Sequence, residues 1–268
     1  MDLRRPLIAA TFAVSIAIGS AGPFATQQAP ATAAASARTW LGHTDAIEAH
    51  LRTAAVTTIE DIGTGVTRPR RAHLDPASPV ESLVWKVLPP GRRNGFWESY
   101  KSEIAAYELD KLLDMRMVPP AVERTINGDT GAAIMFIGSV KSVKEIGGKV
   151  PSGPVWGQSL RKLQMFDNLI ANIDRNAGNI LIGMPGELIL IDHSRAFTDE
   201  NKLIRPVERV DATLWQRMTA LTREDLAKVL SPWLDGDAID AIVERRNRMA
   251  ADVDNLIAKK GRAAVVIP

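Results

Sequence analysis

The chain has 268 residues, which is long enough to bury one sizeable core divided into two lobes. Its formal net charge of +2 is close to balance, so we expect no nucleic-acid partner. The sequence contains no cysteine, and this excludes disulfide bonds, thiolate metal sites and cysteine nucleophiles.

The N-terminus has the pattern of an export signal. Arg4 and Arg5 precede an apolar stretch over residues 7–18, and the small residues at 31–33 and 35–37 offer A-x-A cleavage sites. We therefore expect residues 1–37 to be a signal peptide and a disordered leader. The protein would then be exported to the periplasm or out of the cell. The alternative is a chain that stays anchored to the membrane by this segment.

Strand-like patterns dominate the next part of the chain. Residues 57–87 contain two such stretches, and Gly63 and Gly65 are suited to the turn of a hairpin. A second hairpin is predicted after residue 120, with its turn at Asn127-Gly128. This part of the protein is therefore expected to be a β-rich layer.

One long helix interrupts the strands. We expect a loop over residues 89–95 and then a helix over residues 96–114, where apolar residues recur at helical spacing. Val118-Pro119-Pro120 ends this helix, because proline cannot continue it.

A Gly/Pro-rich joint over residues 147–157 separates this part from a mostly helical one. We therefore expect an N-lobe over residues 38–146 and a C-lobe over residues 147–268, which together give an α+β fold. The C-lobe is predicted to hold two short strands, at 180–182 and 188–191. Its predicted helices span 159–173 and 212–221, a third begins after a cap at Thr222, and the last begins near residue 237.

Three polar residues stand at the ends of these predicted C-lobe elements. Asp174 and Asn179 lie five residues apart between a helix and a strand, and Asp192 ends the next strand. Protein kinases have the same interval between a catalytic aspartate and an asparagine, followed by a metal-binding aspartate. Phosphoryl transfer needs a carboxylate to orient the attacking group and oxygen ligands for Mg²⁺. Each residue alone could be a turn or cap residue, but together they predict a phosphotransfer site.

The surrounding sequence resembles a known group of enzymes. The stretches "FDNLIANIDRNAGNILI" and "ELILIDHSRAF" are similar to the catalytic core of atypical kinases of the HipA, FAM20 and phosphatidylinositol 3-/4-kinase groups. Upstream, "SEIAAYELDKLLDMRMVPPAVER" and "VWKVL" resemble their lobe helix and lysine strand. The resemblance covers roughly residues 59–260 and does not separate the three groups. It implies a two-lobed protein-kinase-like fold, with a β-rich N-lobe that holds one main helix.

The resemblance also implies roles for individual residues. Asp174 would be the catalytic aspartate, and Asn179 and Asp192 would be ligands of Mg²⁺ or Mn²⁺. Lys86 would contact the α- and β-phosphates of ATP. The remaining residues expected to bind the nucleotide are the glycine turn at Gly63 and Gly65, together with Phe136 and Ile137.

The carboxylate that pairs with Lys86 is left open between two residues of the lobe helix. Glu103 matches the family position by its register in "AAYELDKLL", whereas Glu108 lies nearer the apolar stripe. We favour Glu103 because the stripe need not face the nucleotide, and we keep Glu108 as the alternative.

The chain also departs from typical kinases. His193 and Ser194 stand in place of phenylalanine and glycine, and Arg175-Asn176 stands where lipid kinases often carry Arg-His. No A-P-E motif occurs between Asp192 and the helix expected near Asp211, so the usual peptide-docking segment is missing.

These features predict an exported, monomeric atypical kinase that transfers the γ-phosphoryl group of ATP with Mg²⁺ or Mn²⁺. The acceptor could be a protein, a lipid or a small molecule. One alternative is an inactive nucleotide-binding module that recognises a partner. Another is a small-molecule phosphotransferase of the antibiotic or choline kinase kind, which the missing peptide-docking segment supports.

Overall fold

The structure is a computed structural model that describes residues 36–63, 68–76, 79–138, 140–183 and 186–268. The predicted export signal before residue 36 and the predicted nucleotide contact at Gly65 lie outside these residues. Within the described residues, no helix combines the length and the apolar character that a membrane span requires.

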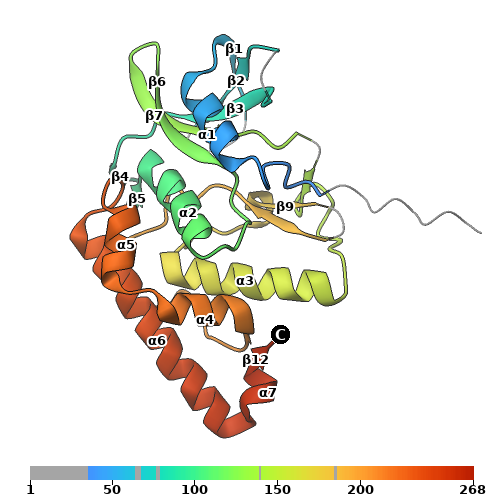
Figure 1. The fold of residues 1–268 in the computed structure, drawn as a ribbon, viewed down its shortest axis with the longest axis vertical. Helices are drawn as coiled ribbons and strands as arrows, with labels where there is room; N and C mark the ends of the chain where they lie inside the picture. The colour runs from blue at the N-terminus through green and yellow to red at the C-terminus, as the bar shows by residue number, and fades with distance from the viewer. Residues whose placement is uncertain (1–35, 64–67, 77–78, 139, 184–185) are drawn as a thin grey trace, which may run out of the picture. The chain divides into compact units, whose positions relative to one another are not determined.

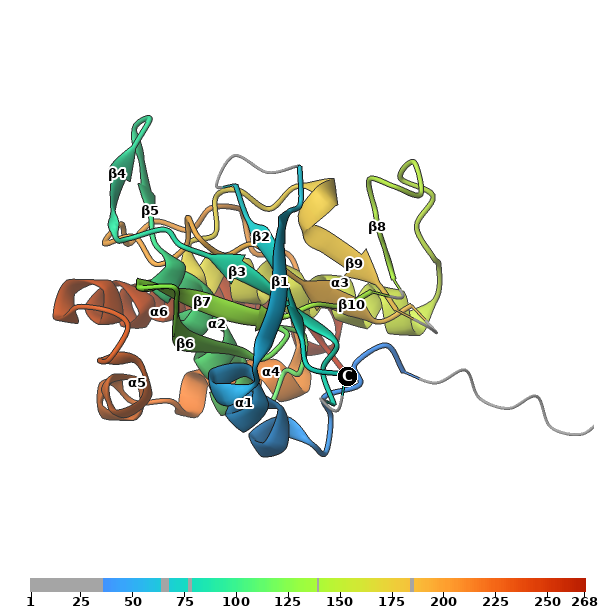
Figure 2. The same cartoon turned by 90° about the horizontal axis from the view of Figure 1, so that it is seen from above.

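A five-stranded antiparallel sheet forms the first part of the fold (Figures 1 and 2). The Asn127-Gly128 turn joins two of its strands, and both residues have positive φ angles, of 53° and 88°, that these residue types tolerate. The predicted second hairpin is therefore confirmed. In spatial order the strands are β1 (Val56–Asp61), β2 (Arg70–Leu74), β3 (Ser82–Lys86), β7 (Asp129–Met135) and β6 (Ala121–Ile126).

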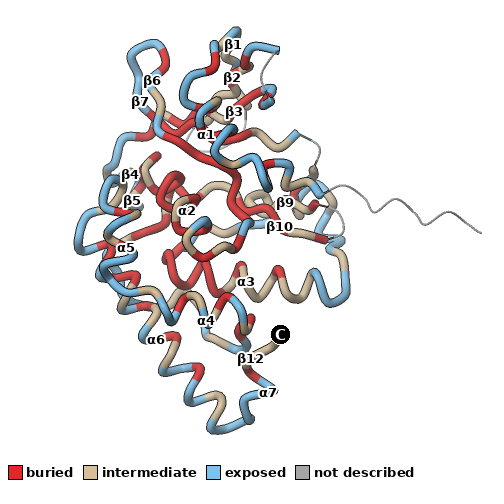
Figure 3. Tube along the Cα trace, viewed as in Figure 1, coloured by how far each residue is buried: buried red, intermediate tan, exposed pale blue. Residues whose placement is uncertain are grey.

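The two faces of this sheet pack against different helices. Leu83 and Trp85 of β3 join a buried cluster with Ile47 and Leu51 of helix α1 (Thr44–Thr53), which the sequence analysis did not predict. Residues of the alternate register, such as Ile134, belong to a second cluster with helix α2 (Tyr100–Leu112) and the C-terminal helices. The buried segments in Figure 3 follow the sheet strands and α2.

The segment before α2 differs from the prediction. Residues 91–98 form a hairpin of strands β4 (Gly91–Arg93) and β5 (Phe96–Glu98), not a loop followed by the start of the helix. Asn94 and Gly95 form the turn, with φ angles of 49° and 85°. The helix begins only after Ser99, whose hydroxyl accepts a 3.0 Å hydrogen bond from the Lys101 N–H.

The C-terminal part is mostly helical, as predicted. Its first helix begins earlier than expected, at Pro154, because proline is well suited to the first position of a helix. The predicted cap at Thr222 is confirmed as a capping box with Asp225. The helices of the described residues are α3 (Pro154–Ile170), α4 (Ala212–Ala220), α5 (Arg223–Leu230), α6 (Gly236–Lys260) and α7 (Arg262–Val265), and a 3₁₀ turn spans Ala177–Asn179.

Two small sheets complete the fold. Strand β9 (Ile180–Ile182) pairs with β10 (Leu188–Leu190) and with β8 (Lys141–Ser142), so both predicted C-lobe strands are confirmed. Strand β11 (Val210–Asp211) runs parallel to β12 (Val266–Ile267). The resulting order, a β-rich part followed by a helical part, is the predicted α+β class. The lobe boundary at residues 146 and 147 stays a prediction.

Gly131 of β7 lies unusually close to the neighbouring strand. A Cβ atom at this position would overlap the carbonyl oxygen of Lys86 and would lie 2.9 Å from its carbonyl carbon. Both are backbone atoms, so the strand itself would have to move. The glycine therefore allows the end of β3 to approach β7.

We expect Gly131→Ala to lower the free energy of unfolding by about 1–3 kcal/mol, as overpacking of a tight site typically does. Urea denaturation measures the change. Gly91→Ala is the matched control, because its nearest neighbour is the flexible Arg93 guanidinium at 3.8 Å. Equal stability of the two variants would show that β3 and β7 are not in close contact at this point.

Candidate active site

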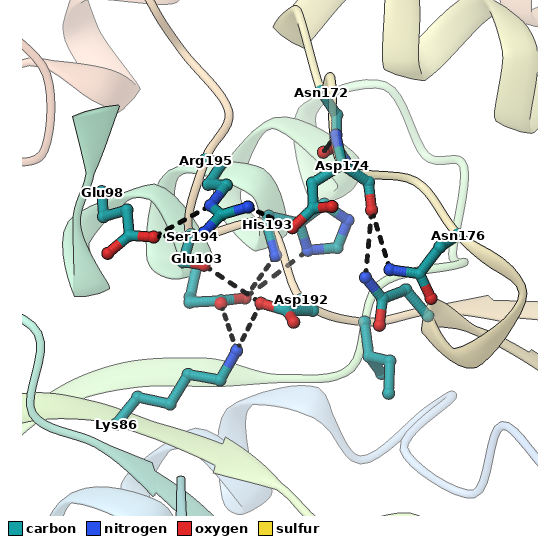
Figure 4. Close-up of polar contacts among 12 residues, drawn as sticks. Lys86, Glu98, Glu103, Asn172, Asp174, Asn176, Asp192, His193, Ser194 and Arg195 are labelled. Atoms are coloured by element: carbon teal, nitrogen blue, oxygen red, sulfur yellow. Dashed lines mark hydrogen bonds and ion pairs between the residues drawn. The ribbon is translucent and has the colours of Figure 1, made fainter. Parts of the chain in front are cut away.

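The amino group of Lys86 is shared by two carboxylates from distant parts of the chain (Figure 4). Lys86 ends β3, Glu103 lies in the first turn of α2, and Asp192 follows β10. The Lys86 Nζ atom lies 2.7 Å from Glu103 Oε1 and 2.8 Å from Asp192 Oδ1. The structure thus brings together three of the predicted site residues. Glu108 contacts Lys111 instead, at 3.1 Å.

Burial and charge act in opposite directions on this ion pair. Lys86 and Glu103 are only 6% and 3% exposed. Burial alone would lower the pKa of Lys86, but the carboxylates of Asp192 and Glu103 outweigh it and raise the pKa above its ordinary value. Burial would likewise raise the pKa of Glu103, and Lys86 and His193 together bring it well below its usual range. Both groups are therefore charged at neutral pH, and Lys86 is a buried, paired residue and not a lysine of the solvated surface.

The backbone at Asp192 turns its carboxylate toward Lys86. Asp192 has a φ angle of 60°, a strained value for a residue with a side chain. Two hydrogen bonds hold the backbone at Asp192 in this conformation. The Ser194 hydroxyl donates to Asp192 Oδ1 at 3.1 Å, and the His193 N–H donates to Glu103 Oε2 at 3.0 Å. The His193 ring is buried against the edge of Phe166, and burial lowers its pKa, so it is neutral.

Asp174 lies in a loop that is held by side-chain amides. Its N–H donates to Asn172 Oδ1 at 3.3 Å, and its carbonyl oxygen accepts from the Nδ2 atoms of Asn176 and Asn179, each at 3.2 Å. These contacts fix the backbone and leave the carboxylate half-exposed, so it is accessible to a substrate. Figure 4 shows this carboxylate turned toward Arg195.

Arg175, the residue after Asp174, ties the loop to the core. Its guanidinium lies 3.1 Å from Asp167 Oδ1, and both side chains are almost completely buried. The same guanidinium donates to the carbonyl oxygens of Asn179 at 2.9 Å and of Ile191 at 2.7 Å. Arg175 therefore sets the distance between the Asp174 loop and the strand that leads to Asp192.

The sequence analysis missed the role of Asp167, although a lone acid among apolar residues at the end of a helix was a signal for it.

A second ion pair that the sequence analysis missed lies on the other side of Asp174. Arg195 donates to Glu98 Oε1 from two nitrogens, at 2.7 and 2.9 Å, and to Asp174 Oδ2 at 3.2 Å. Its guanidinium also stacks over the Phe96 ring, with 4.5 Å to the centroid. Arg195 thus connects the β4–β5 hairpin to the carboxylate of Asp174.

The remaining predicted nucleotide contacts among the described residues lie shortly after two strands of the five-stranded sheet. Gly63 has a φ angle of 71° and open space where a Cβ would be, as the turn after β1 requires. Phe136 and Ile137 directly follow β7, and the Phe136 N–H donates to the Ser82 carbonyl at 3.2 Å. In the described part of the chain these three residues make no hydrogen bond or ion pair with Lys86 or Asp192, so their roles stay predictions.

The oxygen atoms at Asn179 and Asp192 fit a divalent cation. Asn179 donates through Nδ2 and leaves Oδ1 free, while Asp192 uses Oδ1 and leaves Oδ2 free among the described residues. Both free atoms are hard oxygen ligands of the kind that Mg²⁺ and Mn²⁺ prefer. No group of three or more His, Asp or Glu side chains in the described residues could hold a metal ion by itself. A site of two protein oxygens is instead the usual kind for Mg²⁺ that is bound together with phosphates.

Three solved structures share the fold of this chain. Fam20 from hydra, solved with a sugar, has 19% identity and a TM-score of 0.68, with 84% of this chain and 92% of that chain covered. The Golgi casein kinase with Mn/ADP bound has 16% identity and a TM-score of 0.65, with 84% and 78% covered. The Helicobacter pylori proinflammatory kinase CtkA has 10% identity and a TM-score of 0.51, with 79% and 97% covered. The predicted two-lobed, kinase-like fold is thereby confirmed.

Sequence comparison identifies the family. A search of curated protein sequences finds no match to the chain. The family model described as "Phosphatidylinositol 3- and 4-kinase" matches residues 83–228, which are more than half of the chain. That range contains Lys86, Glu103, Asp174, Asn179 and Asp192. The chain therefore belongs to the phosphatidylinositol 3- and 4-kinase family of kinase-like proteins.

Proposed function

We propose that the protein is an active kinase that transfers the γ-phosphoryl group of ATP to a hydroxyl group. One observation carries this proposal: the buried Lys86–Glu103 pair at 2.7 Å, with Asp192 at 2.8 Å from the same nitrogen. Kinases need this lysine–glutamate pair and a metal-binding aspartate in place for transfer. A module that only binds a partner has no need to keep these groups together with Asp174 and Asn179.

Each residue has one task in the proposed reaction. Lys86 binds the α- and β-phosphates, and Glu103 holds Lys86 in position. Asn179 and Asp192 hold Mg²⁺ or Mn²⁺, which supplies positive charge to the phosphates when it is bound. Asp174 orients the acceptor hydroxyl and accepts its proton. The similar fold of the Golgi casein kinase, solved with Mn/ADP, supports this choice of nucleotide and metal.

Asp192→Asn and Asp174→Asn are expected to separate binding from transfer. Asp192→Asn removes a formal charge from the metal ligands and should weaken Mg²⁺-dependent ATP affinity roughly tenfold or more, which is about 1.4 kcal/mol. Asp174→Asn should bind ATP normally and lower the transfer rate by about two to four orders of magnitude. Calorimetry with ATP and Mg²⁺ and a phosphate-transfer assay measure the two effects. ATP affinity unchanged by Asp192→Asn would remove that residue from the metal site.

Lys86→Met is expected to leave the charge of Glu103 buried without its partner. The free energy of unfolding should fall by roughly 3 kcal/mol, and nucleotide affinity should fall with it. The double variant Lys86→Met/Glu103→Gln removes both charges, so it should regain most of the stability without regaining turnover. Urea denaturation and ATP turnover test this pair. Turnover restored in the double variant would mean that Lys86 does not act on the phosphates.

We also propose that the protein works outside the cytoplasm, on the evidence of the apolar stretch over residues 7–18 behind Arg4 and Arg5. Expression of the full chain in a bacterium, followed by mass spectrometry of the periplasmic fraction, should give a mature N-terminus between residues 33 and 38. Deletion of residues 7–18 should keep the protein in the cytoplasm. A full-length protein in the membrane fraction would support the anchored alternative, and one in the cytoplasm would exclude both.

A further inference from the structure

A cavity of about 550 Å³ lies beside the candidate active site. Its lining comes from the β4–β5 hairpin, the start of α2, the segment after Asp192 and the turn between α5 and α6. Figure 1 shows the hairpin above the α5–α6 turn. The volume is within the range of pockets that enclose a small ligand.

The cavity reaches the catalytic loop. Ile173, the residue before Asp174, lines it, and so does Arg195, which contacts the Asp174 carboxylate. Two lining residues are large apolar side chains left unusually exposed, Phe96 at 41% and Ile173 at 54%. Both side chains offer apolar surface that a ligand in the cavity would contact.

The charges around the cavity favour a cationic ligand. Four carboxylates line it, from Asp199, Glu200, Asp235 and Asp237, and we refer to these four residues together as the acidic side. Asp235 also caps helix α6, because its Oδ1 atom accepts from the Ala238 N–H at 2.9 Å. Three cations line it as well, but the guanidinium of Arg195 is already engaged by Glu98 and Asp174. Arg92 and Lys101 form no ion pair within the described residues, so the four carboxylates outnumber the two cations that are not engaged in this way. Trp97 and Trp233 also line the cavity, and indole rings attract cations.

Part of the segment after Asp192 has its backbone groups bonded to side chains of the C-terminal helices. The buried Arg245 donates to the carbonyl oxygens of Thr198, at 3.1 Å, and of Glu200. Asn168 accepts from the Arg205 N–H and donates to the Arg205 carbonyl, both at 3.1 Å. These bonds occupy the carbonyl groups of Thr198 and Glu200 and both backbone groups of Arg205, so a docked peptide strand could not pair with them. The closed backbone and the size of the cavity therefore favour a small acceptor over a polypeptide.

We propose that this cavity binds the phosphoacceptor, and that the acceptor is a small hydroxylated compound that carries an amine. The proposal rests on the proposed kinase function. The acceptor hydroxyl oxygen forms a bond to the γ-phosphorus while the bond from that phosphorus to the β–γ bridging oxygen breaks. The hydroxyl proton passes to Asp174, and the products are a phosphate monoester and ADP. The acidic side holds the ammonium group of the acceptor.

Two probes with the same hydroxyl groups test the charge preference. A two-ring aminoglycoside is cationic, and its fully N-acetylated derivative is neutral. Each is titrated calorimetrically into the full chain with Mg²⁺ and a non-hydrolysable ATP analogue. We expect the aminoglycoside to bind at least tenfold more tightly, and its phosphorylation to be detected by mass spectrometry when ATP replaces the analogue.

A double variant tests whether the preference for a cationic ligand arises in the cavity. Glu200→Gln/Asp237→Asn removes two carboxylates of the acidic side, and both residues are exposed, so the fold should survive. We expect it to lose at least fivefold in aminoglycoside affinity and to keep its affinity for the nucleotide. Asp252→Asn is the control, because Asp252 is an exposed carboxylate on the same helix away from the cavity lining.

Three results would overturn the proposal. The first is equal affinity for the two probes, or no binding of either, in protein that binds the nucleotide. The second is an equal loss of affinity in Asp252→Asn and in the double variant. The third is transfer to phosphatidylinositol vesicles or to an arginine-flanked serine peptide with the aminoglycoside left untouched. Failure of the wild-type protein to bind ATP in a titration without probe would instead count against the kinase function. The two probes would then be titrated into the same protein without the analogue, and equal affinity for both would overturn the charge preference of the cavity.

Discussion

The contact of Lys86 with Glu103 and Asp192 is the interaction on which the rest of the site depends. Two of these three groups are buried, and a buried charge is tolerated only when its partner is within reach. Strand β3, helix α2 and the segment after β10 must therefore meet at one point. A shift of α2 by a single turn would move Glu103 by about 5.4 Å and leave both charges unpaired. The position of α2 is thus the main geometric constraint on the candidate active site.

Contacts made by the rest of α2 hold the helix in the position that Glu103 requires. Tyr107 and Lys111 lie one and two turns beyond Glu103, and both donate to the same oxygen of Glu48 on α1, at 2.8 and 2.7 Å. At the end of α2, Asp110 accepts hydrogen bonds from the backbone N–H groups of Met117 and Val118. These contacts oppose rotation and translation of α2, so helix α1 supports the position of Glu103 in the candidate active site.

The features that the sequence predicted well are those with local causes. The capping box at Thr222 and the turn at Asn127-Gly128 depend on residues within a few positions of each other. Helix α1 was missed because its short sequence buries only two large apolar side chains, Ile47 and Leu51, and so gives almost no periodic signal. The hairpin before α2 was missed because its strands have three residues each, too few to show alternation, although Asn94-Gly95 is a strong turn pair.

Spacing along the chain identified Asp174, Asn179 and Asp192, but it cannot show pairs such as Arg195–Glu98, which are 97 residues apart in sequence.

The two kinds of ion pair at this site differ in how far they are buried, which only the structure shows. Lys86–Glu103 is enclosed and must stay formed, whereas the Asp174 carboxylate in its contact with Arg195 is 42% exposed. A half-exposed pair at 3.2 Å contributes little stability, so its partners can be exchanged at small cost. The protein therefore holds the contact of Lys86 with Glu103 and Asp192 rigidly and leaves the contact of Asp174 with Arg195 able to adjust.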